Sequence, residues 1–200
     1  MKHRIVYTLC LLLLAPVLCL SAQESDTDVS AQLYDDEIPV PEIDLIVGPR
    51  VGLTAIIMDF AQFNSEMQVG FPKEQEYFPI FTEFGFSAKQ QIAMGDSGRD
   101  LIVEEIMLIA GLDQSFAIPA FRFLLGIEGR IGSEIKVGPY LVFADNSGKV
   151  GLKASFIYSI GWTIRSAGMI LPIDISFVPQ PTYWQPRITI TTGLSFRIPE

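Results

Sequence analysis

The sequence predicts an all-β fold, an eight-stranded antiparallel up-and-down transmembrane β-barrel, on three observations. Eight segments between Leu45 and Ile198 alternate apolar and polar residues with a period of two, which is the period of a β-strand. Nearly every charged residue in these segments falls on one face, and Leu, Ile, Val and Phe fill the opposite face. The chain also begins with a short basic and apolar stretch that is typical of exported proteins.

Residues 1–22 are predicted to be a secretory signal peptide. Basic residues precede the apolar run 5–20, and small residues follow it just before Gln23. This run is too short for a helix that spans a membrane. Cys10, Cys19 and His3 all lie in the predicted signal, so the exported chain is expected to contain no disulfide, no thiol and no histidine.

The composition excludes several classes of function. Without histidine and cysteine the exported chain cannot form a Ser-His-Asp triad, a Cys-His pair or a histidine-based zinc site, so we expect no enzymatic activity, no metal and no cofactor. The net charge is −9 before the basic signal residues are removed. Because phosphate binding needs a basic surface, nucleic acid is not an expected partner.

Two regions follow the predicted signal. Residues 23–44 contain many acidic residues and no basic one, so this stretch is expected to be a solvated, disordered tail, with partner binding as the alternative. Residues 45–198 are expected to form the barrel. Its alternating segments are 45–57, 78–89, 101–110, 116–129, 135–143, 150–161, 173–177 and 187–198.

The connections between these segments carry turn and loop signals. Residues 95–98 and 145–148 predict tight turns, and the proline-rich stretch 179–186 predicts a rigid loop. Residues 58–75 are also predicted to be a loop, because the segment contains Asn64, a glycine and a proline.

Segment 101–110 is the least regular of the eight. Its alternation places Glu105 on the apolar face, opposite to all the other strand charges. Either a β-bulge resets the register there, or the segment is an amphipathic helix instead of a strand.

The polar face of the predicted strands mixes glycine and small residues with isolated charges of both signs. This composition suits the narrow interior of a closed barrel, where large side chains on every strand would collide. An unpaired charge in such an interior is costly, so we expect the charges to pair into a network that plugs the lumen. The expected network consists of Arg50, Glu83, Arg122, Glu128, Lys136, Lys153, Asp174 and Arg187.

The last predicted strand carries a terminal motif. Thr191, Gly193, Phe196 and Ile198 are spaced as in the C-terminal insertion signal of bacterial outer-membrane barrels, although two further residues follow Ile198 here. With the signal peptide and the eight strands, the chain resembles the small eight-stranded outer-membrane barrels of the OmpA, OmpX and OmpW type, and no subfamily is indicated. The resemblance implies location in the bacterial outer membrane, contact with its lipid and insertion by the barrel assembly machinery.

Three hypotheses of function follow. The first is a non-catalytic barrel with a plugged lumen, acting in envelope structure or in surface interaction through loops 59–76 and 178–185. The second, implied by the OmpW-type resemblance, is a porin-like conduit or binding site for a small hydrophobic molecule, lined by Phe81, Tyr140 and Ile157. The third is a soluble periplasmic lipid-binding barrel with its apolar face inward.

Overall fold

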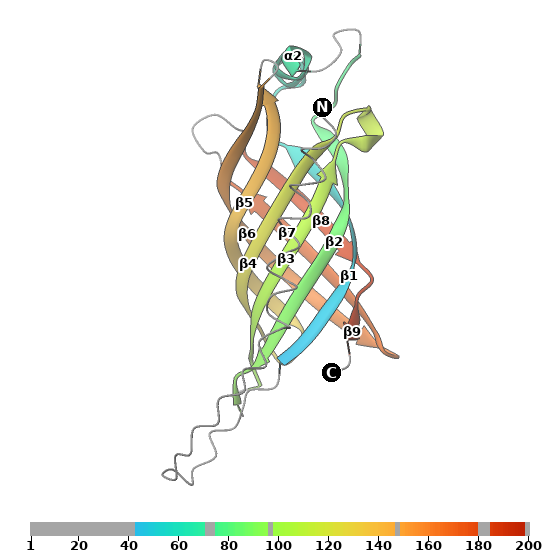
Figure 1. Cartoon of the computed structure of the whole chain (residues 1–200), viewed down its shortest axis with the longest axis vertical. Coiled ribbons are helices and arrows are strands. Elements are labelled where there is room, and N and C mark those ends of the chain that lie inside the picture. Colours follow the sequence, from blue (N-terminus) through green and yellow to red (C-terminus); the bar gives the residue numbers. More distant parts are fainter. Residues whose placement is uncertain (1–42, 71–74, 96–97, 147–148, 180–184, 199–200) are drawn as a thin grey trace, which may run out of the picture. The chain divides into compact units, whose positions relative to one another are not determined.

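A computed structural model describes residues 43–70, 75–95, 98–146, 149–179 and 185–198, and Figure 1 shows their arrangement. The predicted signal peptide and nearly all of the predicted acidic tail lie outside these residues. The described strands are β1 (Ile43–Ile56), β2 (Ile80–Ala93), β3 (Asp100–Ala110), β4 (Ile118–Glu128), β5 (Ser133–Asn146), β6 (Lys149–Ser166), β7 (Met169–Val178), β8 (Arg187–Gly193) and β9 (Phe196–Ile198).

The strands close into a barrel. Each strand from β1 to β7 pairs antiparallel with the next one in the chain, and β1 also pairs with β8. The short β9 continues β8 along β1 in the same register, because Arg50 pairs with Gly193 and Val47 pairs with Phe196. The predicted eight-stranded antiparallel up-and-down barrel is therefore confirmed.

Helix α2 (Phe60–Gly70) lies in the connection between β1 and β2. The prediction of a loop there is wrong. Asp59 precedes the helix, and its Oδ1 accepts hydrogen bonds from the backbone N–H of Ala61 at 2.9 Å and of Gln62 at 3.4 Å. This side chain satisfies donors that the first helical turn leaves without partners, so Asp59 is the N-cap.

Strand β3 contains residues 101–110, the segment with the least regular alternation in the sequence. Its register with β2 and β4 is unbroken from Asp100 to Ala110, so both the β-bulge and the helix predicted as alternatives are wrong. Glu105 pairs with Ala88 on one side and with Phe123 on the other. It therefore shares the outward face with the apolar residues of these strands.

The two faces of the sheet have opposite polarity. Outward residues such as Ile135, Phe156 and Ile160 are 61–72% exposed, whereas the inward Arg122 and Lys136 are each 1% exposed. A soluble barrel of the third hypothesis requires the apolar face inward, and the structure places that face outward. In the described part of the chain, no helix is long and apolar enough to cross a membrane.

The two ends of the barrel differ. The helix end carries α2 and the connections that follow β1, β3, β5 and β7. The turn end holds the first residue of β1, the last residue of β9 and short turns after β2, β4 and β6. The turn between β6 and β7 contains only Ala167 and Gly168, which both adopt positive φ angles of 49° and 81°, as tight hairpins require.

Candidate functional site: the ionic lumen

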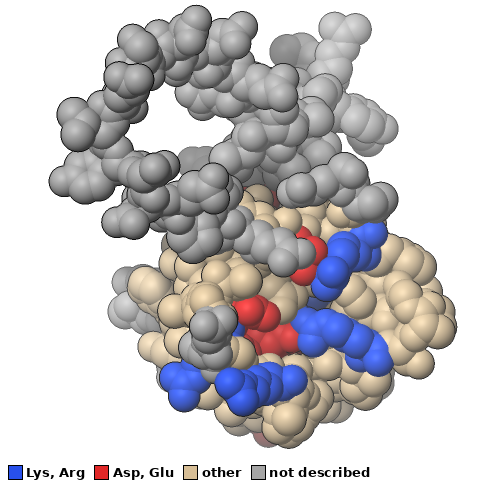
Figure 2. Space-filling view, turned by 90° about the horizontal axis from the view of Figure 1, so that it is seen from below, with Lys and Arg blue, Asp and Glu red and all other residues tan. Residues whose placement is uncertain are grey.

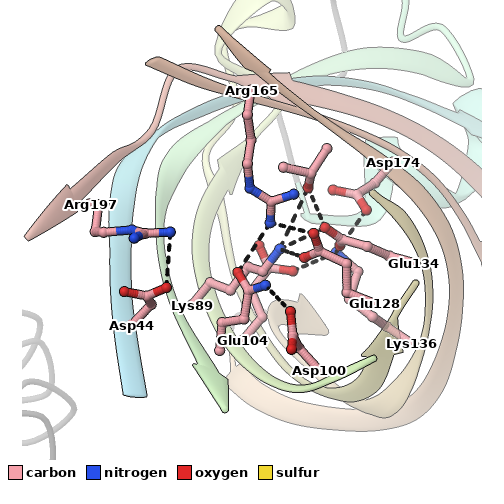
Figure 3. A network of polar contacts seen from close by, with 12 residues as sticks. Asp44, Lys89, Asp100, Glu104, Glu128, Glu134, Lys136, Arg165, Asp174 and Arg197 are labelled. Carbon is pink, nitrogen blue, oxygen red and sulfur yellow. Dashed lines mark hydrogen bonds and ion pairs between the residues drawn. The ribbon is translucent and has the colours of Figure 1, made fainter. Parts of the chain in front are cut away.

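Lys136 lies at the centre of a buried ionic network inside the barrel (Figure 3). It projects inward from β5 toward three carboxylates that come from β3, β5 and β7. The Nζ atom of Lys136 is 2.6 Å from Glu104 Oε2, 2.7 Å from Glu134 Oε2 and 2.8 Å from Asp174 Oδ1. All four side chains are at most 4% exposed, so water contributes little to their solvation.

Three further cations extend this network. Arg50 pairs with Glu104 and, at 3.2 Å, with Asp174, and its Nε donates to Ser87 at 2.9 Å. Lys89 Nζ lies 2.8 Å from Glu128 and 2.6 Å from Glu134. Arg165 pairs with Glu128 at the turn end of the lumen.

The part of the network that ion pairs connect is electrically neutral. It contains four cations, Arg50, Lys89, Lys136 and Arg165, and four carboxylates, Glu104, Glu128, Glu134 and Asp174. A neutral and hydrogen-bonded set of charges is the arrangement in which burial of ions costs least. The lumen at this level is therefore filled by protein charges that satisfy one another.

A second polar cluster lies closer to the helix end. Arg122 pairs with Glu83, and Glu83 also accepts a hydrogen bond of 2.7 Å from Thr54 Oγ1. The Arg122 and Arg187 guanidinium carbons lie 5.4 Å and 5.3 Å from the centroid of the Tyr140 ring. Both distances are within the range of a cation–π interaction, so the Tyr140 ring attracts both cations.

The lumen becomes apolar toward the helix end. Tyr140 and Ile157 belong to a buried cluster with Ile106, Leu108, Ala120, Leu124, Val142 and Val178. Phe81 belongs to a second cluster with Phe63, Tyr77, Ala110 and Phe116. The three residues predicted as lumen contacts for a small molecule are at most 4% exposed, and they pack against the protein's own side chains.

The structure places all eight predicted network residues on inward faces. Six of them form the ion pairs described above, and Arg187 lies against Tyr140 and donates to its hydroxyl at 3.5 Å. Lys153 pairs in register with the inward Val142 but is only half-buried. The sequence prediction omitted four members, Lys89, Glu104, Glu134 and Arg165, although the period-two alternation placed Lys89 and Glu104 on the polar face.

Gly161 provides the room that Asp174 occupies. These residues are paired across β6 and β7, and a Cβ atom on Gly161 would lie 2.2 Å from Asp174 Oδ1. A side chain at this position would displace the carboxylate from Lys136. This contact gives one inward glycine a specific role in the network.

The residues of the predicted insertion signal occupy both faces of the last strand. Thr191 is buried in the lumen, and Gly193 approaches Pro49 so closely that a Cβ atom would lie 2.3 Å from its carbonyl oxygen. Phe196 and Ile198 are 47% and 45% exposed on the outer face. Their role in insertion stays a prediction. In the described residues, no group of acidic, histidine or cysteine side chains is suited to hold a metal ion.

Comparison with known proteins finds similarity in structure only. No protein-family model matches the sequence, and no curated protein matches it. The crystal structure of Ail, the attachment invasion locus protein of Yersinia pestis, is 10% identical, with a TM-score of 0.47 over 78% of this chain and 97% of that chain. The backbone structure of the outer membrane protein Ail in a phospholipid bilayer nanodisc is 12% identical, with a TM-score of 0.45 over 78% of this chain and 100% of that chain.

The crystal structure of Neisserial surface protein A is 6% identical, with a TM-score of 0.46 over 78% of this chain and 97% of that chain. At such identities the likeness concerns the fold and nothing beyond it. The class of protein follows from this chain's own strand pairing and burial. It is a closed eight-stranded β-barrel with an ionic interior and an apolar exterior.

Proposed function

We propose that this chain is an integral barrel of the bacterial outer membrane, with a plugged and non-catalytic lumen, that acts in envelope structure or surface interaction. The proposal depends on the polarity of the barrel, which has apolar side chains outside and charged side chains inside, the opposite of a water-soluble protein. Many outward Leu, Ile, Val and Phe side chains are 37–72% exposed around the strands, while ten charged residues are at most 5% exposed inside. Such an exterior is stable where lipid, not water, surrounds it.

The filled lumen supports a structural role over a conduit. The ionic network occupies the part of the lumen toward the turn end, and two apolar clusters occupy the part toward the helix end. An eight-stranded barrel has an interior just wide enough for its own side chains. A porin-like path for small hydrophobic molecules would require both parts to open.

The helix end supports surface interaction. Asn64 of α2 accepts a hydrogen bond of 3.0 Å from the backbone N–H of Tyr77, and this contact ties the helix to the chain that leads into β2. Phe60 and Phe78 remain 40% and 54% exposed, with ring centroids 5.3 Å apart. Because short turns of outer-membrane barrels face the periplasm, the helix end would face outward and present these two rings to partners.

Fractionation tests this proposal. We expect the expressed protein to stay in the membrane fraction after carbonate washing and to migrate differently on gels with and without boiling. Release into the soluble periplasm would refute the membrane location. In liposomes, we expect the purified protein to release no entrapped small solutes, and leakage would instead support the conduit.

A further inference from the structure

Exposed charges are sorted by sign between the two ends of the barrel. Among the charged residues whose exposure the structure gives, those exposed at the helix end are Asp59, Glu66, Glu76 and Asp113, which are all acidic. Those at the turn end are all arginines, Arg99, Arg130, Arg165 and Arg197, and we call these four the arginine rim. Figure 2 shows basic side chains around a group of carboxylates at this end.

The arginine rim is built from different parts of the chain. Arg99 immediately precedes β3, Arg130 lies in the turn between β4 and β5, Arg165 is near the end of β6, and Arg197 is in β9. Arg130 also reaches the neighbouring turn, because a Cβ atom on Gly98 would lie only 2.1 Å from its Nε atom. The barrel thus brings four separate segments together at one rim.

The guanidinium groups lie outside the carboxylates that accompany them. The Arg165 side chain is 37% exposed and its partner Glu128 is 2% exposed. The Arg197 side chain is 53% exposed, and Asp44, whose Oδ2 is 2.9 Å away, is 24% exposed. Since a guanidinium has five N–H donors, each of these arginines can bind an external anion while it keeps its carboxylate partner.

Exposed apolar side chains accompany the arginine rim. Ile131, Ile164 and Phe196, which directly neighbour Arg130, Arg165 and Arg197 in the chain, are 70%, 48% and 47% exposed. Apolar side chains beside a long cationic side chain are suited to the boundary between hydrocarbon and head groups. This combination favours a phosphate attached to lipid over a soluble anion.

We propose that the arginine rim binds the phosphate groups of anionic phospholipids in the leaflet at the turn end. This inference rests on the proposed membrane location. One basic residue near an anionic membrane surface strengthens the attraction about five-fold. The rim would therefore select anionic over zwitterionic lipid around the barrel and hold the turn end at the level of the head groups.

Trp162 offers a reporter for this selection. It lies on the outer face of β6, is 49% exposed and pairs with Ser133 at the turn end. The only other tryptophan in the sequence is Trp184, so in the Trp184→Phe variant all tryptophan fluorescence comes from Trp162. This chain would be reconstituted in phosphatidylcholine vesicles that contain equal fractions of brominated phosphatidylglycerol or brominated phosphatidylcholine, whose bromines quench nearby tryptophan.

We expect brominated phosphatidylglycerol to quench Trp162 more strongly than brominated phosphatidylcholine does. Arg130→Gln should lower this preference about five-fold, because one cation is lost from the rim. Arg130→Lys should keep most of it.

Lys153→Gln removes the same charge near the helix end and is the matched control, which should leave the preference unchanged. A heat-modifiable band verifies folding of each variant, and Arg99→Gln replaces Arg130→Gln if the latter does not fold.

Each other outcome has a defined meaning. Equal quenching by the two lipids, or an unchanged preference in folded Arg130→Gln, overturns lipid binding by the arginine rim. Loss of the preference in excess inorganic phosphate also overturns it, because the rim would then bind a free anion. Absence of quenching by either brominated lipid overturns the membrane location itself, so failure of the proposed function is distinguishable from failure of this inference.

Discussion

Replacement of Lys136 tests whether the ionic network holds the barrel together. Lys136→Met removes the one ammonium group that contacts Glu104, Glu134 and Asp174, at 2.6, 2.7 and 2.8 Å. Removal of one partner from a buried ion pair typically costs about 3–5 kcal/mol. Glu104 and Asp174 would keep Arg50, and Glu134 would keep Lys89, but the buried carboxylates of the network would outnumber its cations by one. A loss of this size lowers the folding equilibrium constant by about a hundred-fold or more.

The free energy of unfolding would be measured by urea titration of the protein in lipid vesicles, with the heat-modifiable band as the signal for the folded barrel. Lys136→Met combined with Glu134→Gln removes one charge of each sign, so it should recover part of the loss. Lys153→Met is the matched control, since Lys153 is half-buried, and it should change stability by less than about 1 kcal/mol. A loss below about 1 kcal/mol in Lys136→Met would refute the reasoning.

Three further predictions concern single contacts. Gly161→Val should destabilise the barrel by about 1–3 kcal/mol in the same titration, because its Cβ would occupy the space of Asp174 Oδ1, 2.2 Å away. Asn64→Ala removes the acceptor of the 3.0 Å bond from Tyr77, so limited proteolysis should cut near α2 faster while the heat-modifiable band persists. Glu105→Leu should stabilise the barrel by about 1–2 kcal/mol in vesicles, because the outward carboxylate lies in the apolar band.

Each of these changes has a control of similar size. Ala154→Val adds a side chain on the outer face and should not destabilise the barrel as Gly161→Val does. Ser65→Ala should leave proteolysis near α2 unchanged. Val103→Leu, two residues from Glu105 on the same face, should be nearly neutral. Equal effects in a variant and its control would contradict the contact that the variant tests.

The barrel could be predicted because one physical rule governs most of its residues. Where one face meets an apolar surrounding and the other lines the lumen, side chains must alternate, and a slip of one residue would exchange the two faces. This rule placed Arg50, Arg122 and Lys136 inside from the sequence alone. Glu105 departs from the rule, yet its strand keeps its register because the other ten residues of β3 pair regularly with β4.

The features that could not be predicted from the sequence depend on contacts between residues that are far apart in the chain. The choice of partners within the network, such as Lys89 with Glu134, depends on barrel closure, which alternation alone does not specify. Helix α2 carried a local signal in the capping Asp59, but Asn64 suggested a loop. Asn64 lies within the helix, and its side chain accepts a hydrogen bond from the backbone N–H of Tyr77, outside the helix.

Closure of the barrel has a consequence for its assembly. Arg50 lies on β1, the strand that joins both edges of the sheet, and it pairs with Glu104 of β3 and Asp174 of β7. These pairs cannot all form until the edges meet. A closure shifted by one residue would turn Arg50 toward the apolar exterior and leave Glu104 and Asp174 with Lys136 as their shared cation. The network therefore disfavours closure of the barrel in a register shifted by one residue, because that register would place the Arg50 charge on the apolar face.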